Sequence, residues 1–205
     1  MPDSTAVATQ RPEELRSPLT PRMLNHAAWV TDDVEATADF YTRIMGMEIA
    51  ATVLDDKVPS TGDAFPYFHI FFRMSDGSTM AFFEAPGLPP AATSTHPAYD
   101  IFNHFAMQAD SPEELHQWRE WLGQNDVEVL GPIDHGSILS IYFHDPNGLR
   151  LEIATPLTSD WNRRVERGQA DLAAWIAAKN RAREQGKDVS KSLIEFIRGR
   201  KQSAG

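Results

Sequence analysis

The stretch LNHAAWVTDDVEATADFYTRIMGMEI, residues 24–49, decides the fold of this 205-residue chain. Residues 23–30 alternate and predict a strand. Residues 32–46 then carry apolar side chains at helical spacing, and Gly46 ends the predicted helix. Residues 47–54 predict a second strand that leaves this helix. The stretch therefore indicates a strand–helix–strand unit.

Two further apolar segments follow, YFHIFFRM at residues 67–74 and STMAFFEA at residues 78–85. Both read as strands, and the turn residues Asp76 and Gly77 between them are typical of a hairpin. Residues 23–86 are thus expected to form a βαβββ module.

The same order of elements then recurs. Strands are expected at 100–109, 127–131, 137–145 and 149–155, and a helix that Ser111 and Pro112 open is expected at 111–122. The copies also match locally, since Leu24-Asn25-His26 corresponds to Phe102-Asn103-His104. A repeat of this kind predicts an α+β fold in which two modules pair their sheets around a shared cleft.

The repeat and its flanks define five expected segments. They are an N-terminal arm (1–21), a first βαβββ module (22–86), a linker (87–99), a second βαβββ module (100–156) and a helical C-terminal tail (157–205).

Composition excludes several classes of protein. No cysteine is present, which rules out disulfides and thiolate metal sites, and no apolar run approaches the ~18 residues of a transmembrane helix. The first twenty residues lack the apolar core of a secretory signal, so a cytoplasmic location and no membrane partner are expected.

Charge is distributed unevenly within the net charge of −10. Residues 160–205 hold eleven Lys and Arg against six Asp and Glu, a net +5, which leaves −15 on residues 1–159. The strongly negative charge of residues 1–159 disfavours nucleic acid as a partner. The apolar residues of the basic tail, Trp175 and Ile176 among them, indicate packing on the core or on a second copy, and a homodimer is expected.

Strand alternation sorts the side chains that face the cleft. His26 and His104 lie at matching places in the first strands of the modules, and Glu152 lies on a face of the last strand; Glu84 is its counterpart if a small gap is allowed. Imidazoles and carboxylates suit a borderline or hard divalent metal. The alternative is that the histidines are structural and the glutamates solvated.

At these residues the sequence resembles the vicinal oxygen chelate superfamily, which includes glyoxalase I, type I extradiol dioxygenases, and fosfomycin and bleomycin resistance proteins. The resemblance covers roughly residues 22–156 and is carried by residues 24–49 and by DHGSILSIYFHDPNGLRLEI, residues 134–153. It implies paired βαβββ modules, a U-shaped mixed sheet around a metal cleft, and a small-molecule substrate that chelates the metal through two vicinal oxygens.

Resemblance to the extradiol dioxygenases implies Fe(II) on His26, His104 and Glu152, a catechol-like aromatic substrate, and O2 as the second substrate. It also implies catalytic roles for His135 and Tyr142, the first in proton transfer and the second as a hydrogen-bond donor to a substrate oxygen. Aromatic residues flank the expected cleft: Phe65, Tyr67, Phe68, Phe71 and Phe82.

Two features depart from the dioxygenase pattern. Gly77 and Ser78 stand where those enzymes usually carry a catalytic histidine, and Glu84 stands where they usually lack a ligand. With Glu84 as fourth ligand, the set resembles glyoxalase I, so a lyase or isomerase using Ni, Zn, Co or Mn is the main alternative. A non-catalytic small-molecule binding protein of the antibiotic-resistance type is the third.

Overall fold

The computed structural model describes residues 19–89 and 96–203. The N-terminal arm expected at 1–21 and the linker expected at 87–99 therefore lie largely or partly outside the described residues. The described residues divide into two compact units: one holds those up to Met107 with Gln117–Leu130 and Tyr142–Glu152, and the other holds Gln108–His116, Gly131–Ile141 and those from Ile153 onward.

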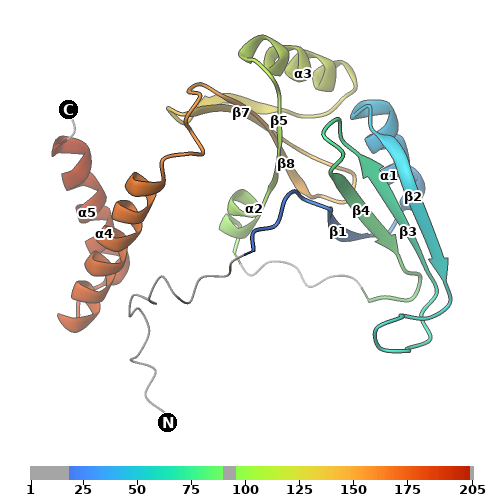
Figure 1. Cartoon of the computed structure of the whole chain (residues 1–205), viewed down its shortest axis with the longest axis horizontal. Coiled ribbons are helices and arrows are strands. Elements are labelled where there is room, and N and C mark those ends of the chain that lie inside the picture. The colour runs from blue at the N-terminus through green and yellow to red at the C-terminus, as the bar shows by residue number, and fades with distance from the viewer. Residues whose placement is uncertain (1–18, 90–95, 204–205) are drawn as a thin grey trace. The chain divides into compact units, whose positions relative to one another are not determined.

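Module 1, residues 26–84, follows the predicted βαβββ order (Figure 1). Its elements are β1 (His26–Thr31), α1 (Val34–Asp39), the π-helical turn η2 (Phe40–Ile44), β2 (Glu48–Asp55), β3 (Tyr67–Arg73) and β4 (Thr79–Glu84). They build one four-stranded sheet of order β1-β4-β3-β2, in which β1 is parallel to β4 and the other neighbours are antiparallel.

Local chemistry explains the helix of module 1. Asp33 is its N-cap, because the Asp33 carboxylate accepts a hydrogen bond from the Ala36 amide at 2.9 Å. The helix widens into η2 and ends at Gly46, whose φ of +67° few other residues tolerate. Tyr41 of η2 stacks on Phe72 of β3 with ring centroids 5.1 Å apart, and both side chains are fully buried. The helix thus covers one face of the sheet.

Module 2, residues 98–156, repeats the order after a short extra helix. Its elements are α2 (Ala98–Phe102), β5 (Phe105–Gln108), α3 (Pro112–Gln124), β6 (Leu130–Asp134), β7 (Ile138–His144) and β8 (Arg150–Pro156). The strands form a second sheet of order β5-β8-β7-β6. The prediction of an α+β fold with tandem βαβββ modules is confirmed.

Two strand predictions in module 2 are wrong in extent. Residues 98–102 form the helical turn α2 instead of the start of a strand, because Pro97 begins the turn and the chain becomes extended only at Asn103. The strand expected at 127–131 begins instead at Leu130.

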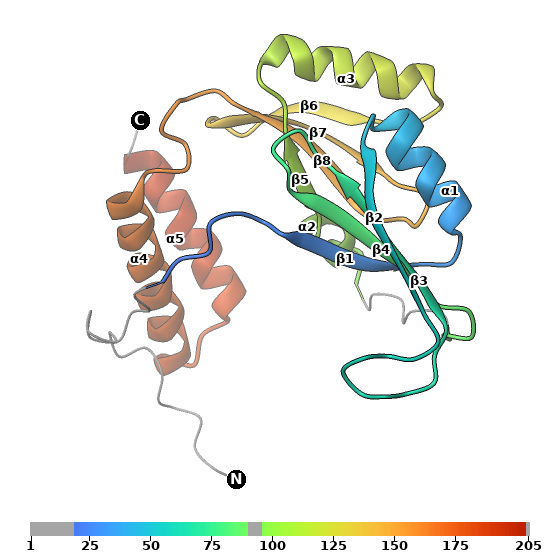
Figure 2. The same ribbon diagram turned by 45° about the vertical axis from the view of Figure 1, so that its right-hand side comes forward.

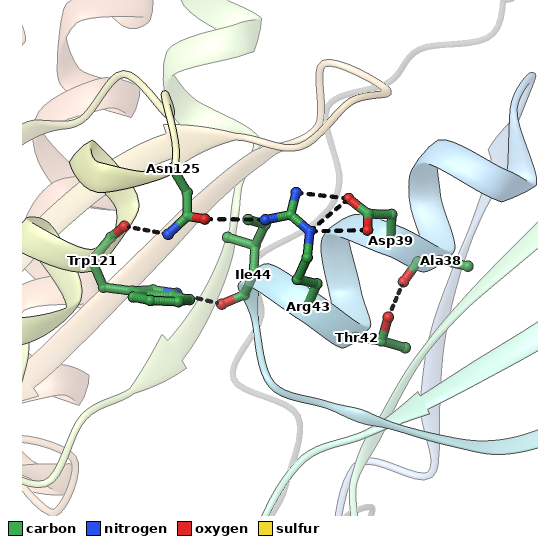
Figure 3. A network of polar contacts seen from close by, with 7 residues as sticks. All are labelled: Ala38, Asp39, Thr42, Arg43, Ile44, Trp121 and Asn125. Carbon is green, nitrogen blue, oxygen red and sulfur yellow. Dashed lines mark hydrogen bonds and ion pairs between the residues drawn. The ribbon is translucent and has the colours of Figure 1, made fainter.

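A polar network joins the helices of the two modules (Figure 3). The Trp121 indole N–H of α3 donates to the Ile44 carbonyl at 2.8 Å, and Arg43 donates to the Asn125 side-chain carbonyl at 3.1 Å. Asp39 pairs with Arg43 at 2.8 Å on the other side, and this ion pair holds the pKa of Asp39 below its usual value. These bonds tie the end of the first helix of module 1 to the end of α3.

The C-terminal helices predicted from the sequence are present as α4 (Val165–Glu184) and α5 (Val189–Ser203). They pack against each other as a hairpin (Figure 2). Arg164 anchors the start of α4 through hydrogen bonds to Ser137, Thr158 and Asp160. Within the described part of the chain, neither α4 nor any other helix is long and apolar enough to cross a membrane.

Candidate metal centre

One imidazole and one carboxylate meet on module 2. His104, just before β5, and Glu152 of the neighbouring strand β8 lie with Nε2 and Oε2 2.8 Å apart, a contact that is an ion pair when the imidazole is protonated. The Glu152 side chain is only 5% exposed, whereas that of His104 is 30% exposed. A buried carboxylate is costly without a cationic partner, so this pair marks a place where positive charge is favoured.

The donor chemistry of the pair fits a divalent metal. Metal bonds to imidazole nitrogen and carboxylate oxygen are about 2.0–2.2 Å long, which separates two donors at a right angle by roughly 3 Å. The 2.8 Å separation of His104 Nε2 and Glu152 Oε2 is close to that spacing. His104 and Glu152 therefore lie at a distance from which both could bind one ion with little movement.

Tyr142 lies beside this pair. Its ring meets the His104 ring edge to face at 5.7 Å between centroids, and the Arg150 guanidinium carbon lies 4.6 Å from the Tyr142 ring centroid. Arg150 and Glu152 alternate with buried Leu151 along β8, so both project from the face that carries Tyr142. We call this face, with His104, Tyr142, Arg150 and Glu152, the open face of module 2.

Module 1 contributes His26 at the start of β1. Its Nδ1 lies 2.7 Å from the Asn25 side-chain oxygen. Because an amide oxygen only accepts hydrogen bonds, this contact places the proton on Nδ1 and leaves Nε2 with a free lone pair. Histidines that bind metals are usually oriented in this way. His26 therefore fits the part of a ligand, as the sequence predicts.

An aromatic wall surrounds His26. The register pairs β1 with β4 and β4 with β3, so that Phe71, Phe83 and His69 share the face of His26, which we call the open face of module 1. The His26 ring lies 5.4 Å from Phe71 and 6.1 Å from His69. Phe82, which the sequence also assigned to the cleft, instead lies fully buried against Tyr41 under the helix.

His69 is a further member of this wall. It is 7% exposed, it stacks on Phe83 at 3.5 Å, and its Nε2 is buried without a hydrogen-bond partner. Burial lowers the pKa of His69, and the nearby His26 adds to the effect. Strand alternation in the sequence predicts that His69 shares the face of Phe71, and the strand register agrees with this prediction.

Glu84 is not brought together with His26. It pairs in register with Thr31, five residues along β1 from the His26–Thr79 pair, a separation of roughly 16 Å along a strand. Glu84 also lies on the helix-covered face, where its carboxylate accepts the Val34 amide N–H at 2.9 Å. The β4 residues on the face of His26 are Thr79, Ala81 and Phe83, and none of them carries a carboxylate.

His135 lies in the turn between β6 and β7, where its amide donates to the Ile138 carbonyl at 2.9 Å. His135 is exposed, and it belongs to a different compact unit from Tyr142. Across residues 19–89 and 96–203, no group of three or more His, Cys, Asp or Glu side chains could hold a metal ion. Among the described residues of one chain, His104 and Glu152 are paired, and His26 is not grouped with them.

Residues 23–153 match the Glyoxalase/Bleomycin resistance protein/Dioxygenase superfamily, and the chain belongs to that superfamily. Its matched part is similar to several relatives of differing activity.

MhqA of Bacillus subtilis (strain 168), a proposed ring-cleaving dioxygenase, is 23% identical over 131 residues, which are 62% of this chain and 38% of MhqA. The metallothiol transferase FosB of Staphylococcus epidermidis is 38% identical over 61 residues, 29% of this chain and 42% of FosB. The chain thus spans less than half the length of these curated relatives.

Among solved structures, a glyoxylase/bleomycin resistance protein/dioxygenase domain from Frankia sp. EAN1pec superposes with a TM-score of 0.54 at 14% identity. The match covers 67% of this chain and 99% of the Frankia chain. This likeness supports the fold alone. The C-terminal helices α4 and α5 lie outside the superfamily match.

Proposed function

We propose that the chain is a metal-dependent vicinal oxygen chelate enzyme, and within that class an Fe(II) extradiol dioxygenase that cleaves a catechol-like ring. The observation that carries the proposal is the His104–Glu152 pair, which offers one nitrogen and one oxygen donor 2.8 Å apart on a half-buried face. His26 supplies the second imidazole. Two histidines and one carboxylate are the donor set of non-haem Fe(II) oxygenases.

The β4 residues on the open face of module 1, Thr79, Ala81 and Phe83, carry no carboxylate, which favours this set over the four-ligand one. Ala81 stands four residues after Gly77, as Glu152 stands four residues after Gly148, and Glu84 is engaged at the start of α1. A glyoxalase-like lyase would need Glu84 to leave the Val34 amide and reach the other face of the sheet. The lyase remains the alternative that the experiment below tests.

Several residues have a role in this proposal. The bound metal would supply Lewis acidity toward two vicinal oxygens of the substrate and a site for O2. Tyr142 donates a hydrogen bond to a substrate oxygen, and Phe71 and Phe83 pack against the flat ring. His135 holds or delivers a proton as the ring opens.

We further propose that the active form is a homodimer in which His26 of one copy joins His104 and Glu152 of another. One chain does not group these three side chains among its described residues. The outer strands β1 and β5 also leave His26, Ala28 and Ala106 exposed on their open faces. Exposed edge strands of this kind are suited to pairing with a second chain.

Metal analysis combined with oxygen uptake tests the proposed function. Protein loaded anaerobically with Fe(II) should hold one iron per chain and consume O2 when catechol is added, whereas His104→Ala and Glu152→Gln should lose both properties. His116→Ala, an exposed position on α3, is the matched control. Binding of nickel, zinc or cobalt without O2 uptake would favour the lyase, and ligand binding that survives His26→Ala would favour the non-catalytic binder.

A further inference from the structure

Arg150 differs from the other arginines of the described chain through the burial of its unpartnered Nε atom, since exposed arginines such as Arg119 and Arg163 also form no ion pair. Arg43, Arg73, Arg164 and Arg200 each form an ion pair with an aspartate or glutamate. No ion pair joins Arg150 to a carboxylate anywhere in residues 19–89 and 96–203. Its one specific contact is the Tyr142 ring, 4.6 Å below the guanidinium carbon.

Burial makes this isolation significant. The Arg150 Nε atom is buried and has no hydrogen-bond partner, although a guanidinium is permanently charged and offers five N–H donors. The carboxylate closest along the strand, that of Glu152, is engaged by His104. A half-buried cation with an unused donor is destabilising by itself, so such an arrangement is suited to receiving an anion.

Position links Arg150 to the candidate metal centre. It lies two residues before Glu152 on the same face of β8, which places the two Cα atoms about 6.6 Å apart. The Tyr142 ring contacts both the Arg150 guanidinium and the His104 imidazole, so the three side chains lie close together on this face. A small molecule that contacts His104, Glu152 and Tyr142 would also be within reach of Arg150.

We propose that Arg150 is a specificity-determining residue that binds an oxyanion, a carboxylate or a phosphoryl group, carried by the substrate. The proposal rests on the proposed function, since it places the anion on the same molecule as the two vicinal oxygens. The planar guanidinium can bind a two-oxygen anion through paired N–H···O bonds, and stacking on Tyr142 fixes the plane of the guanidinium. The preferred substrate is therefore an acidic vicinal-oxygen compound rather than a neutral catechol.

Inorganic phosphate provides a probe that does not depend on the metal. The full chain, metal-free and labelled with nitrogen-15, is titrated with phosphate at constant ionic strength while the arginine Nε–Hε signals are followed. The Arg150 signal should shift saturably at millimolar phosphate, and the binding should disappear in Arg150→Met. Arg73→Met, which removes an arginine that already has Glu48 as partner, should leave the titration unchanged. A shift of the Arg150 signal that does not saturate overturns the proposal.

The second arm measures selectivity in the Mn(II)-loaded protein by calorimetry, with catechol and 3,4-dihydroxybenzoate as the two ligands. The carboxylated ligand should bind about tenfold more tightly, as expected for one charge-assisted pair. Arg150→Met should abolish this preference and leave catechol affinity unchanged. Equal weakening of both ligands would show a merely structural role and would overturn the proposal. If phosphate binds at Arg150 but neither ligand binds the loaded protein, the proposed function fails while the anion site stands.

Discussion

The hydroxyl of Tyr41 in η2 donates to Oδ2 of Asp145 at 3.1 Å, and both side chains are buried. Asp145 belongs to the turn between β7 and β8, where it also accepts the amide N–H groups of Asn147 and Leu149 at 2.9 Å each. The bond therefore joins the helix of module 1 to the turn that precedes β8. This turn sets the start of the strand that carries Arg150 and Glu152.

Removing that hydroxyl should destabilise the chain. We expect Tyr41→Phe to lower the free energy of unfolding by about 1–2 kcal/mol, because the buried Asp145 carboxylate loses one donor. Urea denaturation followed by circular dichroism gives the value. Tyr99→Phe, at an exposed position on α2, is the control and should change stability little. A Tyr41→Phe variant as stable as the parent would show that the bond contributes nothing to stability.

The same pair predicts an alkaline limit to stability. Burial raises the pKa of Tyr41 well above 10.0, and the negative charge of Asp145 raises it further. Because the folded pKa lies above the unfolded one, the stabilisation is complete below pH 10 and falls as the pH rises toward the folded value. Melting temperatures measured from pH 8 to pH 11 should fall less steeply above pH 10 in Tyr41→Phe than in the parent. Equal slopes in the two proteins would contradict this assignment.

The structure assigns Glu84 to helix capping, and this assignment makes a prediction that separates the two metal hypotheses. Glu84→Gln should leave metal content unchanged and lower stability by about 0.3–1 kcal/mol, since a negative charge near a helix N-terminus is lost. Plasma emission analysis and urea denaturation measure the two effects. Loss of metal from Glu84→Gln would instead support the four-ligand, glyoxalase-like site.

Strand alternation in the sequence predicts most of the fold and the face on which part of the candidate site lies. His104 and Glu152 were expected on one face of module 2, and their 2.8 Å contact agrees with that face assignment. Alternation failed at Glu84 because its match to Glu152 required a gap: Glu84 lies seven residues after Gly77, whereas Glu152 lies four after Gly148. The position four residues after Gly77 is Ala81, which lies on the open face.

Two other features depend on contacts that a sequence does not reveal. Arg150 reads as solvated or ion-paired in the sequence, since arginine usually is, and only the geometry shows it over Tyr142 with a buried, unpartnered Nε. A sequence repeat also predicts that His26 and His104 occupy equivalent places. It does not specify whether equivalent residues meet within one chain or between two copies.

Complementation between inactive variants distinguishes these arrangements. His26→Ala and Glu152→Gln should each be inactive alone. If His26 of one copy completes the His104–Glu152 pair of another, co-expression should restore about a quarter of the parent activity, because half of the dimers are mixed and each has one intact site of two. Mixing Glu152→Gln with His104→Ala is the control, since both substitutions damage the same half-site and no combination is intact. Failure of the first mixture to recover any activity or metal content, with dimers present, would place all three ligands in one chain and refute the shared site.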